Sequence, residues 1–297
     1  MLVNSDNPPG PCQLCGHEPL REFVVPNKTV LWKCSRCGLY QYGPMAAGVH
    51  RDTSSEKPAE ESLTCPKWCT ERRSRRKLRT ATVRLNRIAP LLTADHVSMV
   101  DVGCGFFGAM MEAADRRGWT AVGTDVGKAA VFHCRRRGYR CELCENGRLP
   151  FEDQSFDLLT AWNVIEHVED VMESLAEFRR VLRVGGILAM ETSNANCLKA
   201  RVFGSRYRRF WPSGHTYTFP PLSLKQFVER AGFQVVRQPF VGRLSELPSS
   251  MTCYALGYQA QYELRRVLRI QKAFQLFALR VDSQASRGKS QPLAATA

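Results

Sequence analysis

The stretch Ser98–Met110 constrains the fold of this chain more than any other. A short apolar run carries one carboxylate, Asp101, and then breaks into three glycines, Gly103, Gly105 and Gly108, with an amphipathic segment behind them. This order predicts a buried strand, a tight turn and a helix. Glycine lets the backbone approach a ligand closely, and the helix start adds a partial positive charge. The stretch therefore predicts a nucleotide-type binding turn.

The ligand of this turn is not decided by the glycines alone. They match G-x-G-x-x-G, which is typical of dinucleotide-binding turns and is a weak signal by itself. Asp101 would repel a pyrophosphate but attract a cationic ligand such as S-adenosylmethionine, which carries an ammonium and a sulfonium. Asp125 ends the next predicted strand, about 20 residues beyond the turn, where an acid accepts hydrogen bonds from ribose hydroxyls in either kind of ligand.

Length, charge and cysteine content limit the class of protein. The 297 residues allow one large domain plus a small module, and no apolar run is long enough to span a membrane. The start has no secretory signal, so we expect a cytoplasmic location. A net charge of +14 suits nucleic acid, an anionic membrane or an acidic substrate, but arginines on solvated faces are the favoured explanation. Twelve cysteines then indicate metal-bound and free thiols in a reducing compartment.

Two matching cysteine pairs predict a zinc ribbon at the amino-terminal end. Cys12 and Cys15 form one pair, Cys34 and Cys37 form the other, and a glycine follows each pair. Four thiolates on two tight turns make a closed tetrahedral site, which suits structural zinc and leaves no open position for catalysis. Metal binding would supply about 10–16 kcal/mol of apparent folding energy to so small a module. Residues 22–25 and 30–33 are expected to form a hairpin between the pairs.

Two further cysteine pairs, Cys65 with Cys69 and Cys141 with Cys144, are interpreted as ordinary thiols. Residues 43–62 are polar and predict a linker. Glu71–Ile88 then predicts a very basic helix. A nucleic-acid-binding face is one interpretation. A solvated helix leading into the next domain is favoured, because few aromatic residues lie among the arginines.

The blocks that follow separate the two candidate ligands. Leu149-Pro150-Phe151 precedes a predicted strand that ends at Asn163, and Glu166-His167 lies just beyond it. A helix over 172–182, Gly185-Gly186 and another strand come next. This order closely resembles class I S-adenosylmethionine-dependent methyltransferases, in the small-molecule branch with the ubiquinone-biosynthesis O-methyltransferases, over residues 97–237. The resemblance implies an α/β fold with a doubly wound, seven-stranded, mostly parallel, Rossmann-like sheet.

The resemblance also implies S-adenosylmethionine as the cofactor and a role for particular residues. In its terms Asp101, Gly103 and Gly105 line the methionine end, with Asn163 at its border. Asp125 holds the ribose, and Glu145 or Asn146 contacts the adenine. The family's third glycine falls at position 107, where this chain has Phe107. Gly108 is accordingly interpreted as a coincidence of spacing, and Phe107 puts the geometry of the turn in doubt.

The acceptor side is predicted from residues behind the fourth and fifth strands. His167 is the candidate catalytic base, and the alternative is that Glu166-His167 only caps a helix and closes the pocket. His215 looks like the family's histidine at the mouth of the active site, and Asn194 is a candidate acceptor-site residue. Residues 198–219 are rich in aromatics and arginines, which predicts a lid over an anionic acceptor such as a phosphorylated or nucleotide-linked sugar. An exposed loop with buried aromatic anchors is the alternative.

The predicted organisation has four parts. A zinc ribbon occupies residues 1–45, a linker and basic helix 46–95, the methyltransferase domain 96–285 and a disordered tail 286–297. Within the third part, residues 254–281 predict a basic amphipathic helix that covers the sheet, dimerises or touches a membrane.

The expected reaction is methyl transfer to a small-molecule acceptor, on a hydroxyl of a saccharide or natural-product intermediate. The chain looks like the zinc-ribbon methyltransferases of bacterial pathways of those kinds. An RNA methyltransferase is one alternative, supported mainly by the charge. A non-catalytic, zinc-dependent binding module, in which Phe107 has weakened cofactor binding, is another, and a dehydrogenase is the least favoured.

Overall fold

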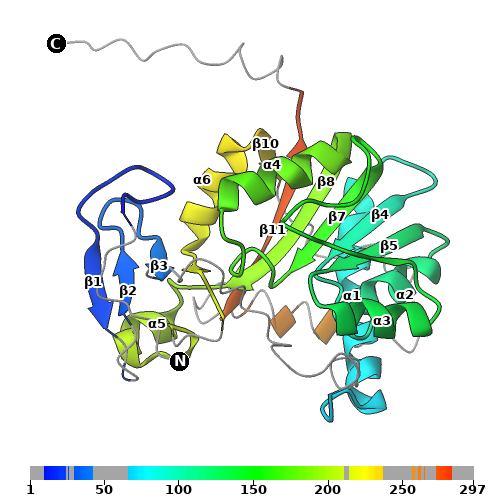
Figure 1. Cartoon of the computed structure of the whole chain (residues 1–297), viewed down its shortest axis with the longest axis horizontal. Helices are drawn as coiled ribbons and strands as arrows, with labels where there is room; N and C mark the ends of the chain where they lie inside the picture. Colours follow the sequence, from blue (N-terminus) through cyan, green and yellow to red (C-terminus); the bar gives the residue numbers. More distant parts are fainter. Residues whose placement is uncertain are drawn as a thin grey trace.

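The computed structural model describes residues 10–24, 26, 30–42, 66–210, 214–236, 256–257, 260–261, 264 and 272–282. Within them the chain builds two sheets that lie side by side (Figure 1). The larger sheet has seven strands in the order β10-β11-β8-β7-β4-β5-β6, and the smaller has four in the order β1-β2-β3-β9. The expected fold class, an α/β protein with a mostly parallel seven-stranded sheet, is confirmed.

The seven-stranded sheet has a parallel centre and one antiparallel strand. Its parallel strands are β4 (Ser98–Val102), β5 (Thr120–Asp125), β6 (Cys141–Leu143), β7 (Phe156–Trp162) and β8 (Leu182–Ser193). β11 (Ala273–Arg280) runs antiparallel to β8 and to β10 (Phe233–Val236). The carboxyl ends of β4, β5 and β7 therefore meet at one edge, which is where ligands bind in such sheets.

Helices cover both faces of this sheet, as a parallel sheet requires. On one face lie α1 (Glu71–Ile88), α2 (Ala109–Asp115) and α3 (Lys128–Arg136), and on the other lie α4 (Val171–Val181) and α6 (Pro221–Arg230) (Figure 1). Neighbouring residues of β4 divide between the two layers: Met99 packs with α1 and α2, and Val100 packs with α4 and α6. Both faces of the central strand are thus buried.

The basic helix α1 has the predicted bounds and is fixed to the sheet by its second half. Thr70 caps its start, and Leu85 and Ile88 are buried against β4 and α2. Arg84 forms a 2.6 Å ion pair with Glu191 of β8, and its guanidinium lies 4.1 Å from the centre of the Trp162 ring. These contacts fit a helix that leads into the large domain, while the arginines of its first half stay exposed.

The expected carboxy-terminal helix is wrong for residues 273–280, which form β11. Phe274, Leu276 and Ala278 alternate along one face of this strand and pack into the core over α4 and α6. A strand is favoured because β11 lies between β8 and β10. The backbone groups of both neighbours that face it need hydrogen-bond partners, which only an extended segment supplies. No helix in the described part of the chain is long and apolar enough to cross a membrane.

The small sheet joins the amino-terminal module to the large domain. Its hairpin of β1 (Arg21–Val24) and β2 (Val30–Lys33) was expected, whereas β3 (Tyr40–Tyr42) was not. The fourth strand, β9 (Tyr217–Thr218), comes from the large domain and pairs with β3. Ser223 of α6 donates a 2.7 Å hydrogen bond to the Cys37 carbonyl, and Arg230 donates one to the Leu14 carbonyl. Strand pairing and hydrogen bonds therefore connect the two sheets.

Candidate active site

The glycine turn after β4 is held open by its backbone conformation. Gly103 and Gly105 both have positive φ, +69° and +63°, which L side chains rarely adopt. A Cβ on Gly103 would lie 2.6 Å from Val164 Cγ2, whereas a Cβ on Gly105 would meet nothing within 4 Å. The turn therefore packs against the segment after β7 on one side and leaves open space on the other. The open side suits close approach of a ligand to the backbone.

Gly108, interpreted from the sequence as a coincidence of spacing, has a structural role in this turn. Gly108 is the N-cap of α2 with φ +58°, and a Cβ there would lie 2.7 Å from Tyr139 Cδ2. The buried Phe107 precedes it, with its ring 6.1 Å from that of Trp68 in the segment before α1. Glycine is therefore required at position 108, one residue after the position that the resemblance implies for a third glycine. Position 107 is used for packing instead.

Asp101 lies at the end of β4 with little access to water. Its Oδ1 accepts a 2.6 Å hydrogen bond from the Thr160 hydroxyl of β7. Burial raises the pKa of Asp101 to about 7, although the Thr160 hydrogen bond opposes this shift. A cationic ligand at this edge would stabilise the ionised form of this buried carboxylate, which has one side-chain hydrogen bond.

Asp125 ends β5 and fixes the turn from the other side. Its Oδ2 accepts a hydrogen bond from the Gly105 N–H and its Oδ1 accepts one from the Gly127 N–H, both at 2.9 Å. Burial raises the pKa of Asp125, and these two N–H groups oppose the rise. A carboxylate has about four acceptor positions, so Asp125 keeps room to accept from a ribose hydroxyl.

The other expected cofactor residues lie on loops after β6 and β7. Glu145 forms an isolated backbone bridge with Arg148, and the exposed Asn146 has a positive φ of 53°. Asn163 follows β7 with φ 58°, and its N–H donates a 2.8 Å hydrogen bond to the Glu191 carbonyl. All three follow strands whose carboxyl ends lie at the edge of the glycine turn. Their part in cofactor binding stays a prediction.

Glu166, His167 and His215 form a cluster beside this edge. One ligand atom from each lies within 4.8 Å of those of the other two, and the two rings meet edge to face with centroids 4.7 Å apart. His167 Nδ1 lies 2.9 Å from the Gly214 carbonyl oxygen, which accepts from the ring N–H. Burial raises the pKa of Glu166 to about 7, and the nearby Thr192 hydroxyl acts in the opposite direction. The two histidines predicted for the active site thus lie together, with a buried carboxylate between the strand end and the ribbon.

Backbone hydrogen bonds link this cluster to the ribbon. The Glu166 carbonyl accepts from the N–H groups of Thr216 (2.7 Å) and Tyr217 (3.1 Å), and Tyr217 belongs to β9 of the small sheet. Asn194, a predicted acceptor-site residue, accepts a 2.8 Å hydrogen bond at Oδ1 from the Asn196 N–H and forms a bridge with Phe219. Its side chain therefore shapes the backbone turn after β8.

The segment 195–210 packs on the ribbon. It contains α5 (Leu198–Phe203) and two short 3-10 turns, η3 (Gly204–Arg206) and η4 (Arg208–Phe210). Tyr207 and Phe210 are buried in a cluster with ribbon residues of β2 and β3. Arg206 and Arg208 stay exposed, and Arg209 donates a 3.0 Å hydrogen bond to the Ser193 hydroxyl. Trp211, part of the expected lid, lies outside the described residues.

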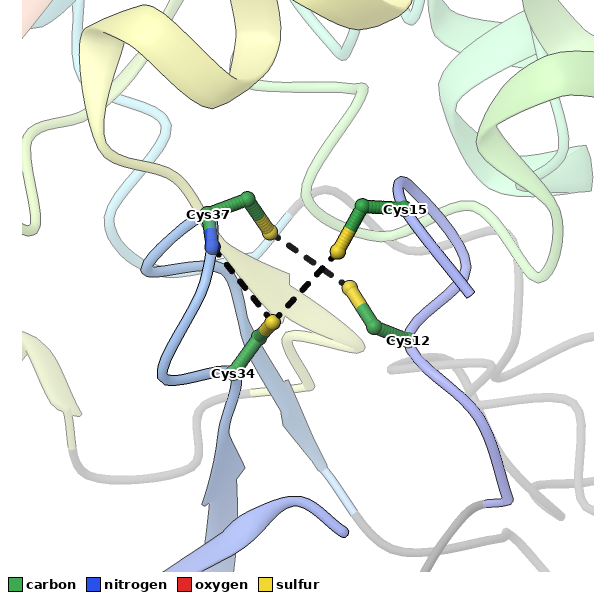
Figure 2. Close-up of side chains that lie close together, drawn as sticks. All are labelled: Cys12, Cys15, Cys34 and Cys37. Atoms are coloured by element: carbon green, nitrogen blue, oxygen red, sulfur yellow. Dashed lines mark hydrogen bonds between the residues drawn. The ribbon is translucent and has the colours of Figure 1, made fainter. Parts of the chain in front are cut away.

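The four predicted metal ligands converge on one point (Figure 2). Cys12 Sγ lies 3.5 Å from Cys37 Sγ, and Cys15 Sγ lies 3.6 Å from Cys34 Sγ. Four thiolates at Zn–S distances of about 2.3 Å would be about 3.8 Å apart, so only a small expansion would admit zinc. The Cys37 N–H also points to Cys34 Sγ at 3.5 Å, which stabilises a thiolate. The donor set and its geometry fit a structural zinc ion.

A second thiol cluster beneath the glycine turn was not predicted. Cys104 Sγ lies 3.4 Å from Cys141 Sγ and 3.9 Å from Cys134 Sγ, and the Cys134 thiol donates to the Gly105 carbonyl. Hydrogen bonds from Cys104 and then Cys134 lower the pKa of Cys141 to about 4. These cysteines come from a turn, a helix and a strand, so no local spacing in the sequence signals their contact.

Known proteins resemble this chain over its central part. Residues 100–190 match the family model described as a methyltransferase domain. A ubiquinone biosynthesis O-methyltransferase of Saccharophagus degradans is 29% identical over 52% of this chain and 70% of its own length. An S-adenosylmethionine-dependent methyltransferase of Mycolicibacterium smegmatis is 31% identical over 46% of this chain and 52% of its own length.

Solved structures add evidence on the fold alone. A Haloferax volcanii complex of the Trm112 methyltransferase activator with a methyltransferase aligns with a TM-score of 0.50 and 16% identity, over 71% of this chain and 95% of that one. Together with the sheet order and the glycine turn, the family match defines a class I S-adenosylmethionine-dependent methyltransferase domain. The protein is a methyltransferase enzyme.

Proposed function

We propose that the protein methylates a hydroxyl group of a small-molecule intermediate of saccharide or natural-product chemistry. One observation carries the proposal, namely the continuity between the cofactor turn and the ribbon. Gly103 of the turn abuts Val164, the same segment carries Glu166 and His167, and its backbone bonds to residues 216–217 on the ribbon sheet. A molecule bound beside this segment would touch both the cofactor site and the ribbon-held residues.

The cofactor side supplies binding and alignment. Asp101, Gly103 and Gly105 would hold the methionine end, Asp125 the ribose, and Glu145 or Asn146 the adenine. Bound S-adenosylmethionine supplies a methyl group that is electrophilic because it is attached to a sulfonium. Methyl transfer is an in-line displacement, so holding the acceptor oxygen in line with that carbon is the main contribution of the protein.

The Glu166–His167–His215 cluster prepares the acceptor. A neutral hydroxyl is a weak nucleophile, so its proton has to leave as the new bond forms. The contact of His167 Nδ1 with the Gly214 carbonyl orients the ring and leaves Nε2 as the acceptor nitrogen. His167 would receive the proton, and His215, with its ring against that of His167, would hold the orientation.

The ribbon and the segment packed on it frame the acceptor. A zinc ion held by the four thiolates would stabilise the ribbon, on which Tyr207 and Phe210 anchor segment 195–210. Lys199, Arg201, Arg206 and Arg208 are exposed along that segment. This excess of positive charge favours an anionic acceptor, such as a phosphorylated or nucleotide-linked sugar.

The test is a labelled-methyl assay on cell extracts separated into small-molecule, lipid and nucleic-acid fractions. We expect label to enter the small-molecule fraction, in a product retained on an anion exchanger. Full-length protein with His167→Ala should label it far more weakly, while the exposed His96→Ala serves as the matched control. Label confined to the lipid or nucleic-acid fraction would overturn the proposal.

An RNA methyltransferase is the second candidate, because of one surface. Five arginines of α1 line a hollow of about 540 Å³ with Thr70: Arg72, Arg73, Arg75, Arg76 and Arg79. Binding through such a surface would weaken steeply with salt. Reversing Arg75 and Arg76 to Glu should abolish RNA affinity under this candidate and leave labelling of the small-molecule fraction unchanged under the first.

A further inference from the structure

We propose that Glu166, His167 and His215 bind a divalent metal ion that receives the acceptor hydroxyl, an inference that rests on the proposed function. One donor atom from each residue already lies within 4.8 Å of the other two. Two imidazole nitrogens and one carboxylate oxygen form a set that binds Mn²⁺, Fe²⁺, Co²⁺ or Zn²⁺ and leaves coordination positions open.

His167 is oriented as a ligating histidine usually is. A metal-bound imidazole typically donates its other ring N–H to a carbonyl or carboxylate, which fixes the ring and its tautomer. His167 Nδ1 makes such a contact with the Gly214 carbonyl at 2.9 Å. Gly214 directly precedes His215, so one short stretch both orients the first histidine and supplies the second.

Glu166 gives an independent reason for a cation at this place. Its side chain is 1% exposed, and within the described residues its Oε2 has no hydrogen-bond partner. A buried carboxylate oxygen without a donor is costly, and a bound cation would satisfy it. The cluster is not sealed, because His167 is exposed, so an acceptor can reach the open coordination positions.

The chain would then hold two metals of different kinds. The ribbon offers four sulfurs in a closed set, which suits zinc and excludes hard ions. The Glu166–His167–His215 cluster offers nitrogen and oxygen, which also suit manganese. Thiolates bind Mn²⁺ weakly. Bound Mn²⁺ therefore reports occupancy of the second site while zinc stays in the ribbon.

The metal would change how the acceptor is activated. A divalent cation beside the hydroxyl lowers its pKa, so the O–H proton passes to water. The acceptor oxygen then forms the new C–O bond as the C–S bond of the cofactor breaks, and sulfur keeps the electron pair. In this arrangement His167 and His215 act through the metal rather than as bases.

The experiment titrates Mn²⁺ into the zinc-loaded full chain and follows free Mn²⁺ by electron paramagnetic resonance. We expect one Mn²⁺ per chain, and an affinity at least about tenfold lower for Glu166→Gln, His167→Ala and His215→Ala. His96→Ala is the matched control, since His96 contacts Thr120 at the opposite end of β5 and should leave the affinity unchanged. S-adenosylmethionine binding by each variant, measured by calorimetry, reports whether the fold is intact.

Two outcomes would overturn the inference: no Mn²⁺ or Zn²⁺ bound beyond the ribbon's zinc, or binding that is the same in Glu166→Gln and wild type. Either result with intact methyl labelling of the small-molecule fraction would leave the proposed function standing. Failure to bind S-adenosylmethionine, or label only in other fractions, would instead remove the proposed function.

Discussion

The proposed cofactor half and the proposed acceptor half of this enzyme are built in different ways. Every candidate contact of the cofactor half except Asn163 lies between Asp101 and Asn146, and backbone conformation at the glycines shapes it. The acceptor half draws on the ribbon, on residues 163–167 and on the described residues of 191–219, which are brought together by contacts such as the pairing of β9 with β3 and the hydrogen bond from α6 to the ribbon. The first comes from one continuous stretch of the chain, and the second combines segments that are far apart in the sequence.

The boundary of the family match follows the same division. Residues 100–190 match the methyltransferase domain, and the match stops before segment 195–219 and does not include the ribbon. The residues predicted to bind the cofactor therefore lie inside the segment that matches the methyltransferase domain. The parts proposed to bind the acceptor lie outside this match. Variants in the two halves should therefore impair different steps.

The largest effect is expected from Gly103→Ala. A Cβ there would lie 2.6 Å from Val164 Cγ2 and would occupy a backbone with φ +69°. Gly118→Ala is the matched control, because its φ of +71° imposes a similar strain of roughly 1–3 kcal/mol, while its Cβ would meet nothing within 4 Å. Calorimetry should show no measurable S-adenosylmethionine binding for Gly103→Ala and near-normal binding for Gly118→Ala. Equal affinities would show that the contact with Val164 does not shape the turn.

Loss of the ribbon metal should separate the two halves. We expect Cys15→Ser with Cys37→Ser to release zinc and to displace the segment that carries Tyr207 and Phe210. A misplacement of about 1 Å can cost about a hundredfold in rate, so kcat/KM for the acceptor should fall by that order. The affinity for S-adenosylmethionine should change little.

The matched control for the ribbon is Cys69→Ser, which alters a thiol outside it. Zinc content by mass spectrometry and cofactor binding by calorimetry are measured on the same samples. Equal losses of cofactor affinity and acceptor turnover in the ribbon variant would contradict the division into two halves.

Sequence patterns predicted the locally built features and missed the tertiary ones. Helix α1 and the ribbon cysteines were predicted because the periodicity of apolar residues and the C-x-x-C spacing are patterns within a few residues of one another. Strand β11 was missed because its helix or strand state depends on the slot between β8 and β10. Strand β9 has two residues and exists only because β3 is beside it.

The candidate site divides in the same manner. His167 was predicted from its place after a strand, and His215 from the resemblance to the family. Their contact at 4.7 Å, and the buried Glu166 beside them, required the ribbon to position residues 214–217. The thiols of Cys104, Cys134 and Cys141 meet only in the folded chain. A pattern along the chain carries no information on such distances.

The pH dependence of cofactor binding should belong to the cofactor half. The pKa of Asp101 is raised to about 7 by burial, so its carboxyl is neutral below that pH and ionised above it. A cationic ligand prefers the ionised form, so affinity should rise with pH, by up to about tenfold per unit below pH 7, and level off above it. Calorimetry between about pH 5.5 and 7.5 tests this. The S-adenosylmethionine affinity of Asp101→Asn should be low and independent of pH. The exposed Asp115→Asn should keep the wild-type pH profile.

The smallest effect is expected from removing the Tyr217 hydroxyl group, which contacts both the ribbon and the segment beyond Glu166. The Tyr217 Oη lies 2.6 Å from Gln13 Oε1 in the ribbon and 2.7 Å from the Glu169 carbonyl oxygen beyond the cluster. Tyr217→Phe removes this link but keeps the buried ring. A net loss of about 1 kcal/mol is expected for one hydrogen bond, or about fivefold in the acceptor KM.

In the same assay kcat and the S-adenosylmethionine affinity should stay near wild type for Tyr217→Phe. Tyr139→Phe is the control on the cofactor side, since its ring packs against Gly108 and is retained. Tyr217→Phe could instead lower the cofactor affinity and leave the acceptor KM unchanged. The hydroxyl would then stabilise the glycine turn at Gly103 through residues 163–170, and the ribbon would support cofactor binding.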